Sequence, residues 1–323
     1  MADATEEDAQ PGGAGESLVI MTFNMLAPCY KRVSSAAVPG GRESGGSAWR
    51  ARMEGQLEYI GEELDAVDEA AYAVVCLQEV WLESPEAMEM VEGFAAERGL
   101  VTHAWKRPRK KKDGVAILVD GRLAIDVADA LCFKDHGNRV VGAVAVTLPL
   151  PTLVTVVVAN VHLTYPHHAG DLRMREAQAK ASLAWLDQTF GAEVPVVWCG
   201  DFNGEATQDA VVSTIVDAGF LSAYHAIHGS GESAGTDLAR LDFVSHHTHA
   251  GTDVGVDYIW TRGPSLAPIS AELLPTHLPS TVWPSTDDWP HSDHRPVLAI
   301  LSVTETTQPA AAAAVASAPS AVK

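Results

Sequence analysis

Short apolar runs alternate with longer amphipathic stretches along the chain. The apolar runs have the length of buried strands, and the amphipathic stretches repeat apolar positions with the period of a helix. The predicted strands are Leu18–Asn24, Val74–Gln78, Val115–Val119, Val140–Thr147, Leu153–Val161, Val194–Cys199, Val256–Trp260 and Pro296–Val303. The predicted helices cover 47–66, 85–98, 170–190 and 207–218. Strands that alternate with helices, without an internal repeat, predict one α/β domain.

The two ends of the chain differ in composition from the rest. Residues 1–16 are acidic and Gly-rich and residues 305–323 are Ala-rich, so we expect disordered tails around a domain at 17–304. Two long loops are predicted inside this domain, a Gly/Ser-rich one at 31–47 and a Pro/Trp-rich one at 262–292. Long loops on a compact domain often border a binding site.

Composition indicates a soluble intracellular protein. The chain has 323 residues, of which 47% are hydrophobic, and no apolar stretch reaches the roughly 18–20 residues of a membrane span. We therefore expect no membrane partner. The first residues have neither the basic nor the apolar part of a secretory signal. Four scattered cysteines, expected to be reduced thiols, favour a cytoplasmic or nuclear protein that is not secreted. They are Cys29, Cys76, Cys132 and Cys199.

A formal net charge of −20 opposes long-range attraction to nucleic acid or anionic lipid. A substrate that carries phosphate would need local cations, supplied by a bound divalent metal or by the run "KRPRKKK" at 106–112, which contains Lys110, Lys111 and Lys112. This basic run has three open interpretations: a loop that steers substrate into a cleft, a solvated loop, or a nuclear-localisation signal.

Polar side chains stand at the ends of six predicted strands. One such residue is most simply explained by an Asx turn, in which the side chain bonds the backbone two residues on. Six strand ends that all carry Asn, Asp, Glu or His are better explained by convergence on one cleft. These residues are Asn24, Glu79, His162, Asp201 with Asn203, Asp257, and Asp293 with His294.

The residue types fit one reaction. The carboxylate of Glu79 and the amide oxygen of Asn24 are hard ligands that suit Mg²⁺ or Mn²⁺ better than zinc. Asp201, with Asn203 nearby, can hold and deprotonate an attacking water, and histidines can donate to phosphoryl oxygens. The chain lacks a G-x-S-x-G motif and an evident cysteine nucleophile. The chemistry therefore favours metal-assisted hydrolysis of a phosphate ester.

Other candidate residues remain open to two interpretations. The spacing of His247 and His249 could hold zinc, although no matching cysteine or carboxylate set is evident, and a surface loop or cleft wall is favoured. Arg173 could bind a substrate phosphate or could be a solvent-facing charge on a helix. Tyr165 could stack on a base or could pack in the fold.

Six motifs in this order resemble the endonuclease/exonuclease/phosphatase superfamily. They are "MTFN", "LQEVW", "NVHL", "GDFNG", "VDYIW" and "SDHRPV", spread over residues 18–303. The resemblance implies two packed mixed β-sheets flanked by helices, a four-layer α/β sandwich, with a metal-dependent cleft at one edge.

The resemblance also assigns roles. It implies that Asn24 and Glu79 sit at Mg²⁺, for which Mn²⁺ could substitute, and that Asp201 activates the water with help from Asn203.

It further implies that His162 and His294 contact the scissile phosphate. Asp257 and Asp293 would orient His294 or complete the metal shell, and which residue does which is left open.

Within the superfamily, "CGDFN" and "DYIW" are similar to the deadenylase, nocturnin and Angel branch. Longer segments look most like a poorly characterised plant and algal subgroup, in which some members carry EF-hands. This sequence contains no EF-hand loop motif, so no EF-hand calcium site is expected.

We therefore expect a Mg²⁺-dependent phosphodiesterase that acts on RNA, as a 3′ exonuclease resembling the deadenylases. One alternative is a phosphatase acting on a small phosphorylated nucleotide or inositol. Another is a catalytically inactive binding scaffold.

Overall fold

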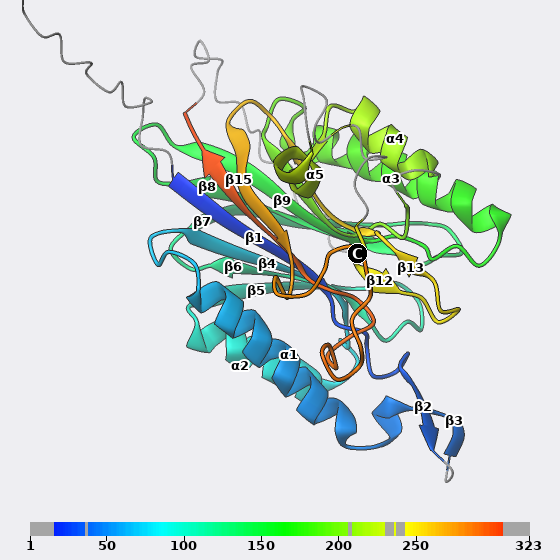
Figure 1. The fold of residues 1–323 in the computed structure, drawn as a ribbon. Coiled ribbons are helices and arrows are strands. Elements are labelled where there is room, and N and C mark those ends of the chain that lie inside the picture. The colour runs from blue at the N-terminus through cyan, green and yellow to red at the C-terminus, as the bar shows by residue number, and fades with distance from the viewer. Residues whose placement is uncertain (1–15, 36–37, 206–208, 230–235, 237–242, 306–323) are drawn as a thin grey trace, which may run out of the picture.

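Two six-stranded mixed sheets pack face to face, with helices on their outer faces (Figure 1). The computed structural model describes residues 16–35, 38–205, 209–229, 236 and 243–305. This architecture confirms the predicted four-layer α/β sandwich. The tails predicted at 1–16 and 305–323 lie almost wholly outside the described residues, and so do the first residues of the helix predicted at 207–218.

The first sheet is covered by α1 (Ala48–Asp65) and α2 (Pro85–Glu97). Helix α2 begins after Ser84, whose hydroxyl accepts a hydrogen bond from the Ala87 N–H, as is typical of a helix N-cap. The strands of this sheet are, in spatial order, β15 (Leu266–Leu273), β16 (Val297–Val303), β1 (Glu16–Asn24), β4 (Tyr72–Val80), β6 (Gly114–Asp120) and β5 (Leu100–Lys106).

The second sheet is covered by α3 (Ala169–Phe190) and α4 (Ala210–Asp217). Its strands are, in spatial order, β11 (Leu221–Ser222), β14 (Asp257–Arg262), β10 (Val196–Asp201), β9 (Val154–His162), β8 (Val140–Leu148) and β7 (Ala124–Cys132). The remaining elements are the hairpin β2 (Arg32–Ser35) and β3 (Val38–Arg42), the 3-10 turn η1 (Glu43–Gly45), the short helix α5 (Ala223–His228), and the hairpin β12 (His246–His247) and β13 (Asp253–Val254). Among the described residues, no helix combines the length and apolar character that a membrane crossing requires.

Alternation along the inner strands decides which side chains face the space between the sheets. In β1, Leu18 and Ile20 pack in the core between the sheets, whereas Val19 and Met21 pack against the layer of α1 and α2. The same alternation continues to the strand end, so Asn24 belongs to the face that looks at the other sheet. Side chains along a strand alternate between its two faces, so the position of a polar residue after an apolar run decides which face it points to.

All eight predicted strands form, and they are inner strands of the two sheets. The edge strands β5, β7, β11 and β15 were not predicted, and β15 lies inside the predicted loop 262–292. The predicted loop 31–47 likewise contains the β2–β3 hairpin. Edge strands expose one face or more to solvent, and β7 is exposed along most of its length, so they lack the continuous apolar run that marks a buried strand.

A buried polar contact joins the two sheets near the ends of β4 and β9. The Asn160 side-chain amide donates to the backbone carbonyls of Leu77 (2.9 Å) and Ala116 (2.8 Å), both in the opposite sheet. Its carbonyl oxygen accepts a hydrogen bond of 2.7 Å from the Gln78 amide, which also donates to the Thr22 hydroxyl. Because these groups are fully buried, the contact fixes how the two strands lie relative to each other.

Replacement of Asn160 should be costly for the fold. We expect Asn160→Ala to lower the free energy of unfolding by about 2–4 kcal/mol, because Gln78 and two buried carbonyls lose their partner. Urea denaturation followed by tryptophan fluorescence measures this change. Thr155→Ala on the same strand removes one half-buried hydroxyl contact with Thr147 and should cost less than about 1 kcal/mol. Equal losses in the two variants would contradict the role of this contact.

Candidate active site

A cavity of about 610 Å³ opens where the ends of β1, β4, β9 and β10 meet the neighbouring loops. The structure brings the predicted site residues together here. Asp257 is fully buried and contacts the cavity through its partner His294. The predicted residues that line the cavity are Asn24, Glu79, His162, Asp201, Asn203, Asp293 and His294.

Asp201 ends β10 at the centre of the cluster. Gly200 before it has a φ of +137°, and a Cβ there would lie 1.9 Å from the Val161 carbonyl oxygen, so this position requires glycine. The Asp201 Oδ1 atom accepts the Asn203 N–H at 2.9 Å, which is an Asx turn, and Oδ2 accepts the Asn24 amide at 3.0 Å. The Asp201 side chain therefore stabilises the turn through one carboxylate oxygen and contacts the other site residues through the second.

Burial raises the pKa of Asp201 to about 6, with the His294 charge opposing the shift and the Asp257 carboxylate adding to it. At neutral pH the carboxylate is therefore mostly ionised and yet more basic than a solvent-exposed aspartate. Both properties suit a group that takes a proton from water.

Asn203 is held in a left-handed backbone conformation, with a φ of 50°. Its side-chain amide donates to the Leu163 carbonyl at 3.0 Å, and its own carbonyl accepts a hydrogen bond from Arg175. Arg175 is buried on α3 and also pairs with Asp209. Arg173, the arginine singled out from the sequence, is exposed on α3 and is not among the residues that line the cavity. The arginine of this helix that supports the site is thus Arg175.

His294 and Asp257 form a buried pair. The Asp257 Oδ2 atom lies 2.8 Å from His294 Nδ1 and accepts the Ser245 hydroxyl at 2.7 Å. Burial opposes charge on the His294 ring, but the carboxylates of Asp257 and Asp201 outweigh it and raise the pKa of His294 to about 10. This contact favours orientation of His294 among the two roles left open for Asp257. Asp201, Asp257 and His294 also form a group whose ligand atoms lie within 4.8 Å of one another.

His162 stands between two carboxylates but is held neutral. Its Nε2 atom lies 3.4 Å from Asp201 Oδ2, and its Nδ1 atom lies 4.0 Å from Glu79 Oε1. Burial lowers the pKa of His162 well below its ordinary value, and the charges of Arg139 and Arg107 act in the same direction. This neutral ring can donate one hydrogen bond into the cavity.

Glu79 and Asp293 fit a divalent cation. Glu79 sits at a bulge of β4 with a φ of 53°, where its Oε2 atom accepts the Ala27 N–H at 3.0 Å. Burial and the carboxylates of Asp113 and Asp293 raise the pKa of Glu79 to about 7. Asp293 Oδ1 is buried and has no hydrogen-bond partner among the described residues. Crowded carboxylates with a free buried oxygen are the donor set that Mg²⁺ or Mn²⁺ takes.

Asn24 can complete this set. Its Oδ1 atom accepts the Leu26 N–H at 3.0 Å, which leaves one lone pair of the amide oxygen available. Glu79, Asp293 and Asn24 are therefore the residues that would hold the metal.

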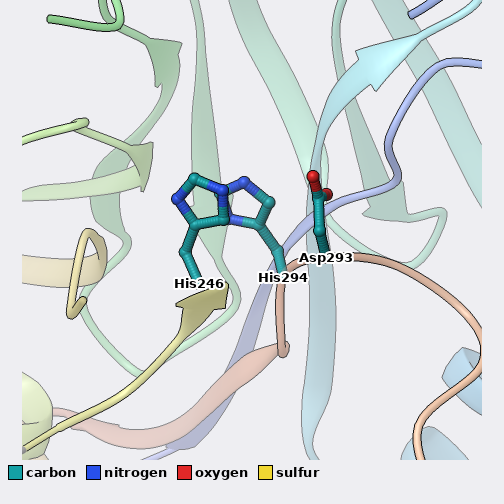
Figure 2. A group of neighbouring side chains, drawn as sticks. All are labelled: His246, Asp293 and His294. Carbon is teal, nitrogen blue, oxygen red and sulfur yellow. The ribbon is translucent and has the colours of Figure 1, made fainter. Parts of the chain in front are cut away.

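His246, Asp293 and His294 also lie close together (Figure 2). The two imidazole rings stack face to face, with centroids 3.9 Å apart and planes within 9°. A metal bound to imidazole lies near the ring plane, and two parallel planes do not meet at one ion. The stack therefore argues against a zinc site that uses both rings, and it gives His246 the role of packing against His294.

Tyr165 and three histidines form one wall of the cavity. Ring centroids lie 4.9 Å apart for Tyr165 and His167, 5.5 Å for Tyr165 and His249, and 6.5 Å for Tyr165 and His246. This aromatic wall (Tyr165, His167, His246 and His249) corresponds to the cleft-wall interpretation of the histidine-rich segments. Rings that line a cavity in this way can contact a nucleotide base.

The basic run divides between cavity and solvent. Lys111 is half-buried and lines the cavity, whereas Lys110 is exposed outside it and Lys112 pairs with Glu83 at 3.2 Å. Arg107 belongs to the basic run at 106–112 and lines the cavity. Arg139 lines it as well and was not singled out from the sequence, although it directly precedes the apolar strand β8.

Comparison with known proteins agrees with this geometry. A family model described as "Endonuclease/Exonuclease/phosphatase family" matches residues 21–294. A protein of Arabidopsis thaliana named as an uncharacterized calcium-binding protein is 30% identical over 258 residues, which are 76% of this chain. The chain spans half the length of that relative.

Solved structures share the fold. The human Nocturnin catalytic domain with bound sulfate has a TM-score of 0.63 at 20% identity, covering 89% of this chain and 95% of that one. ANGEL2, described as a 2′,3′-cyclic phosphatase and bound to adenosine-2′,3′-vanadate, has a TM-score of 0.60 at 17% identity, covering 90% and 96%. TDP2 of D. rerio with a single-strand DNA product has a TM-score of 0.59 at 15% identity, covering 89% and 99%.

The pairing of Asp257 with His294 predicts a shift in titration. In metal-free protein, we expect Asp257→Asn to lower the pKa of His294 by about 1–3 pH units, because the charged ring loses its closest carboxylate. NMR titration of the imidazole resonances measures this shift. Asp253→Asn is the matched control, because Asp253 contacts the half-buried His247 at 2.6 Å. A His294 pKa that moves equally in both variants would refute the pairing.

Proposed function

The chain belongs to the endonuclease/exonuclease/phosphatase family, and on this basis we propose that it is a Mg²⁺-dependent phosphoesterase that cleaves a phosphate ester of a nucleotide unit with water. The observation that carries the proposal is the arrangement of Asp201 between a charged histidine, His294, and a neutral one, His162, in one cavity. Glu79 and Asp293 line the same cavity.

Asp201 is assigned the role of base. Its carboxylate is fixed by Asn203 and Asn24, and its raised pKa favours proton transfer from a water held beside it. The water oxygen then bonds to phosphorus as the ester oxygen leaves. Asn203 supports this step by keeping the turn that directs Asp201 into the cavity.

The two histidines are assigned to the phosphoryl oxygens. His294, charged because Asp257 lies behind it, can donate a charge-assisted hydrogen bond to the oxygens as negative charge grows on them. His162 can donate as a neutral ring. The metal held by Glu79, Asp293 and Asn24 would supply further charge stabilisation as a Lewis acid.

RNA is the first candidate substrate, with cleavage of the 3′-terminal nucleotide in the manner of a deadenylase. The aromatic wall supports a substrate that carries a base, because Tyr165 and three imidazoles border the cavity. A small phosphorylated nucleotide is the second candidate. It is favoured by the net charge of −20, which repels a long polyanion more than a short one.

A turnover assay tests the proposal. Purified protein is incubated with Mg²⁺, Mn²⁺ or EDTA and with poly(A), mixed RNA, single-stranded DNA and a panel of phosphorylated nucleotides and inositols. We expect turnover that needs the metal and falls by about 10²–10⁴-fold in Asp201→Ala. Asp217→Ala, an exposed aspartate at the end of α4, is the control that should keep its rate.

Turnover that survives EDTA or the loss of the Asp201 carboxylate would refute the metal mechanism. Absence of turnover on every substrate would favour the binding-scaffold alternative.

The basic run gives a separate prediction. We expect Lys111→Met to raise KM about three- to tenfold and to weaken the salt dependence of kcat/KM, because Lys111 lines the cavity. Lys110→Met should leave both quantities nearly unchanged, because Lys110 is exposed outside it. Steady-state kinetics at several salt concentrations measure the difference. If the two variants behave alike, the cavity position of Lys111 has no part in substrate binding.

A further inference from the structure

Arg139 is a buried cation with unused hydrogen-bond donors. Only 8% of the residue is exposed, and it lines the cavity directly before β8. Its Nε and Nη1 atoms are buried and have no hydrogen-bond partner among the described residues. An arginine buried in this way carries a free-energy penalty until acceptors reach it. The fold does not supply those acceptors, so a ligand in the cavity is the natural source.

The backbone before Arg139 is fixed by a second arginine. Arg107 forms an ion pair with Asp113 at 3.0 Å, and its remaining donors reach the carbonyls of Asn138 (3.0 Å) and Gly137 (2.9 Å). Asp113 is further held by the Tyr30 hydroxyl at 2.6 Å. The hydrogen bonds of Arg107 hold the turn at 137–138, and this turn places Arg139 beside the cavity. Arg107 therefore does not compete with Arg139 for the same ligand.

Lys111 adds a second available cation. It lines the same cavity, and the charges of Arg107 and Arg139, after burial, lower its pKa, which places Lys111 close to both. Asp113 balances Arg107, but among the described residues no carboxylate forms an ion pair with Arg139 or Lys111. Two positive charges therefore remain without an ion-pair partner among the described residues at this wall, in a protein whose net charge is −20.

We propose that Arg139 and Lys111 form a binding subsite for a second phosphate group of the substrate, separate from the group that is hydrolysed. This inference rests on the proposed function for the identity of the hydrolysed group. The scissile group already has His162 and His294 and the metal residues around it. Arg139 borders this site, because the charges of Glu79 and Asp201 act on it, whereas the charges that act on Lys111 are those of Arg107, Arg139 and Asp113. The subsite is therefore placed beside the scissile group, on the side of Lys111.

A phosphate matches this subsite in charge and in chemistry. A phosphate monoester carries between one and two negative charges at neutral pH, close in magnitude to the positive charge of Arg139 and Lys111. Its oxygens are strong acceptors for guanidinium and ammonium donors. The expected substrate is thus a nucleotide with two phosphate groups, in which the second is either a terminal monoester or the next phosphodiester of an RNA chain.

A binding experiment in EDTA tests the subsite without turnover. The probes are adenosine, adenosine 5′-monophosphate and adenosine 3′,5′-bisphosphate, titrated into the full-length protein by calorimetry. We expect Arg139→Met to weaken binding of both phosphorylated probes by about 10- to 100-fold, the effect of losing charge-assisted hydrogen bonds, and to leave adenosine unaffected. Lys134→Met removes an exposed cation five residues earlier, outside the cavity, and should change nothing.

A kinetic experiment with Mg²⁺ then tests selectivity. The wild type should show a lower KM for adenosine 3′,5′-bisphosphate than for the monophosphates, and a lower KM for ApApA than for ApA, which lacks the next phosphodiester. Arg139→Met should remove these preferences by raising KM for the substrates that carry the second phosphate, and Arg139→Lys should restore part of them because it keeps the charge. Any change in kcat should be the same for every substrate, because the charge of Arg139 also helps to keep His162 neutral. If Arg139→Met loses the preference for the bisphosphate, the subsite binds a terminal monoester. If it loses only the preference between the oligonucleotides, the subsite binds the next phosphodiester of the chain.

Three outcomes would overturn the subsite. One is unchanged probe binding in both folded Arg139 variants. Another is an equal rise of KM for mono- and bisphosphorylated substrates, which would place Arg139 on the scissile group. The third is a matching effect of Lys134→Met, which would indicate net charge alone. Phosphate binding that depends on Arg139, without turnover of any substrate, would support the subsite while refuting the proposed function.

Discussion

The position of every residue in the cavity depends on how the two sheets are held against each other, and the buried contact of Asn160 with Gln78 fixes this relation. Apolar faces alone would allow one sheet to shift on the other at small cost, because their contacts are not directional. The hydrogen bonds from Asn160 to the carbonyls of Leu77 and Ala116 remove this freedom. Glu79 follows Gln78 by one residue and His162 follows Asn160 by two, so the distance between these site residues is inherited from the contact.

Two histidines in one cavity carry different charges because different elements surround them. His294 has Asp257 directly behind its ring, whereas His162 faces the charges of Arg139 and Arg107. The charge of each ring is set by its surroundings, which for His294 include its sequence neighbour Asp293. The four strands that end at this edge bring a carboxylate, a cationic imidazole and a neutral imidazole into one small volume. Glu79 and Asp293 lie beside the two rings, with Glu79 Oε1 4.0 Å from His162 Nδ1 and Asp293 close to His294.

Much of the site was predictable because side chains along a strand alternate between its two faces. Inner strands carry continuous apolar runs, and a polar residue at the end of such a run inherits a direction toward the other sheet. Partners contributed by loops were not predictable in this way, since Arg139 and Ser245 come to the site through turns whose course the strand pattern does not encode. The exposed position of Arg173 had the same cause, because a helix with charges around much of its surface does not reveal which one points inward. Gln78 and Asn160 could have been recognised in the sequence, because each is an amide side chain inside an apolar run.

Glu79 and Asn203 both have left-handed backbone conformations, with φ values of 53° and 50°. Such conformations cost a non-glycine residue about 1–3 kcal/mol and persist only while their surroundings hold them. Here the surroundings are a few contacts at the mouth of the sandwich, such as the Ala27 N–H on Glu79 and the Leu163 carbonyl on Asn203. On warming, residues in this conformation gain by relaxing. We therefore expect the mouth of the cavity to lose its arrangement at a lower temperature than the sheets behind it.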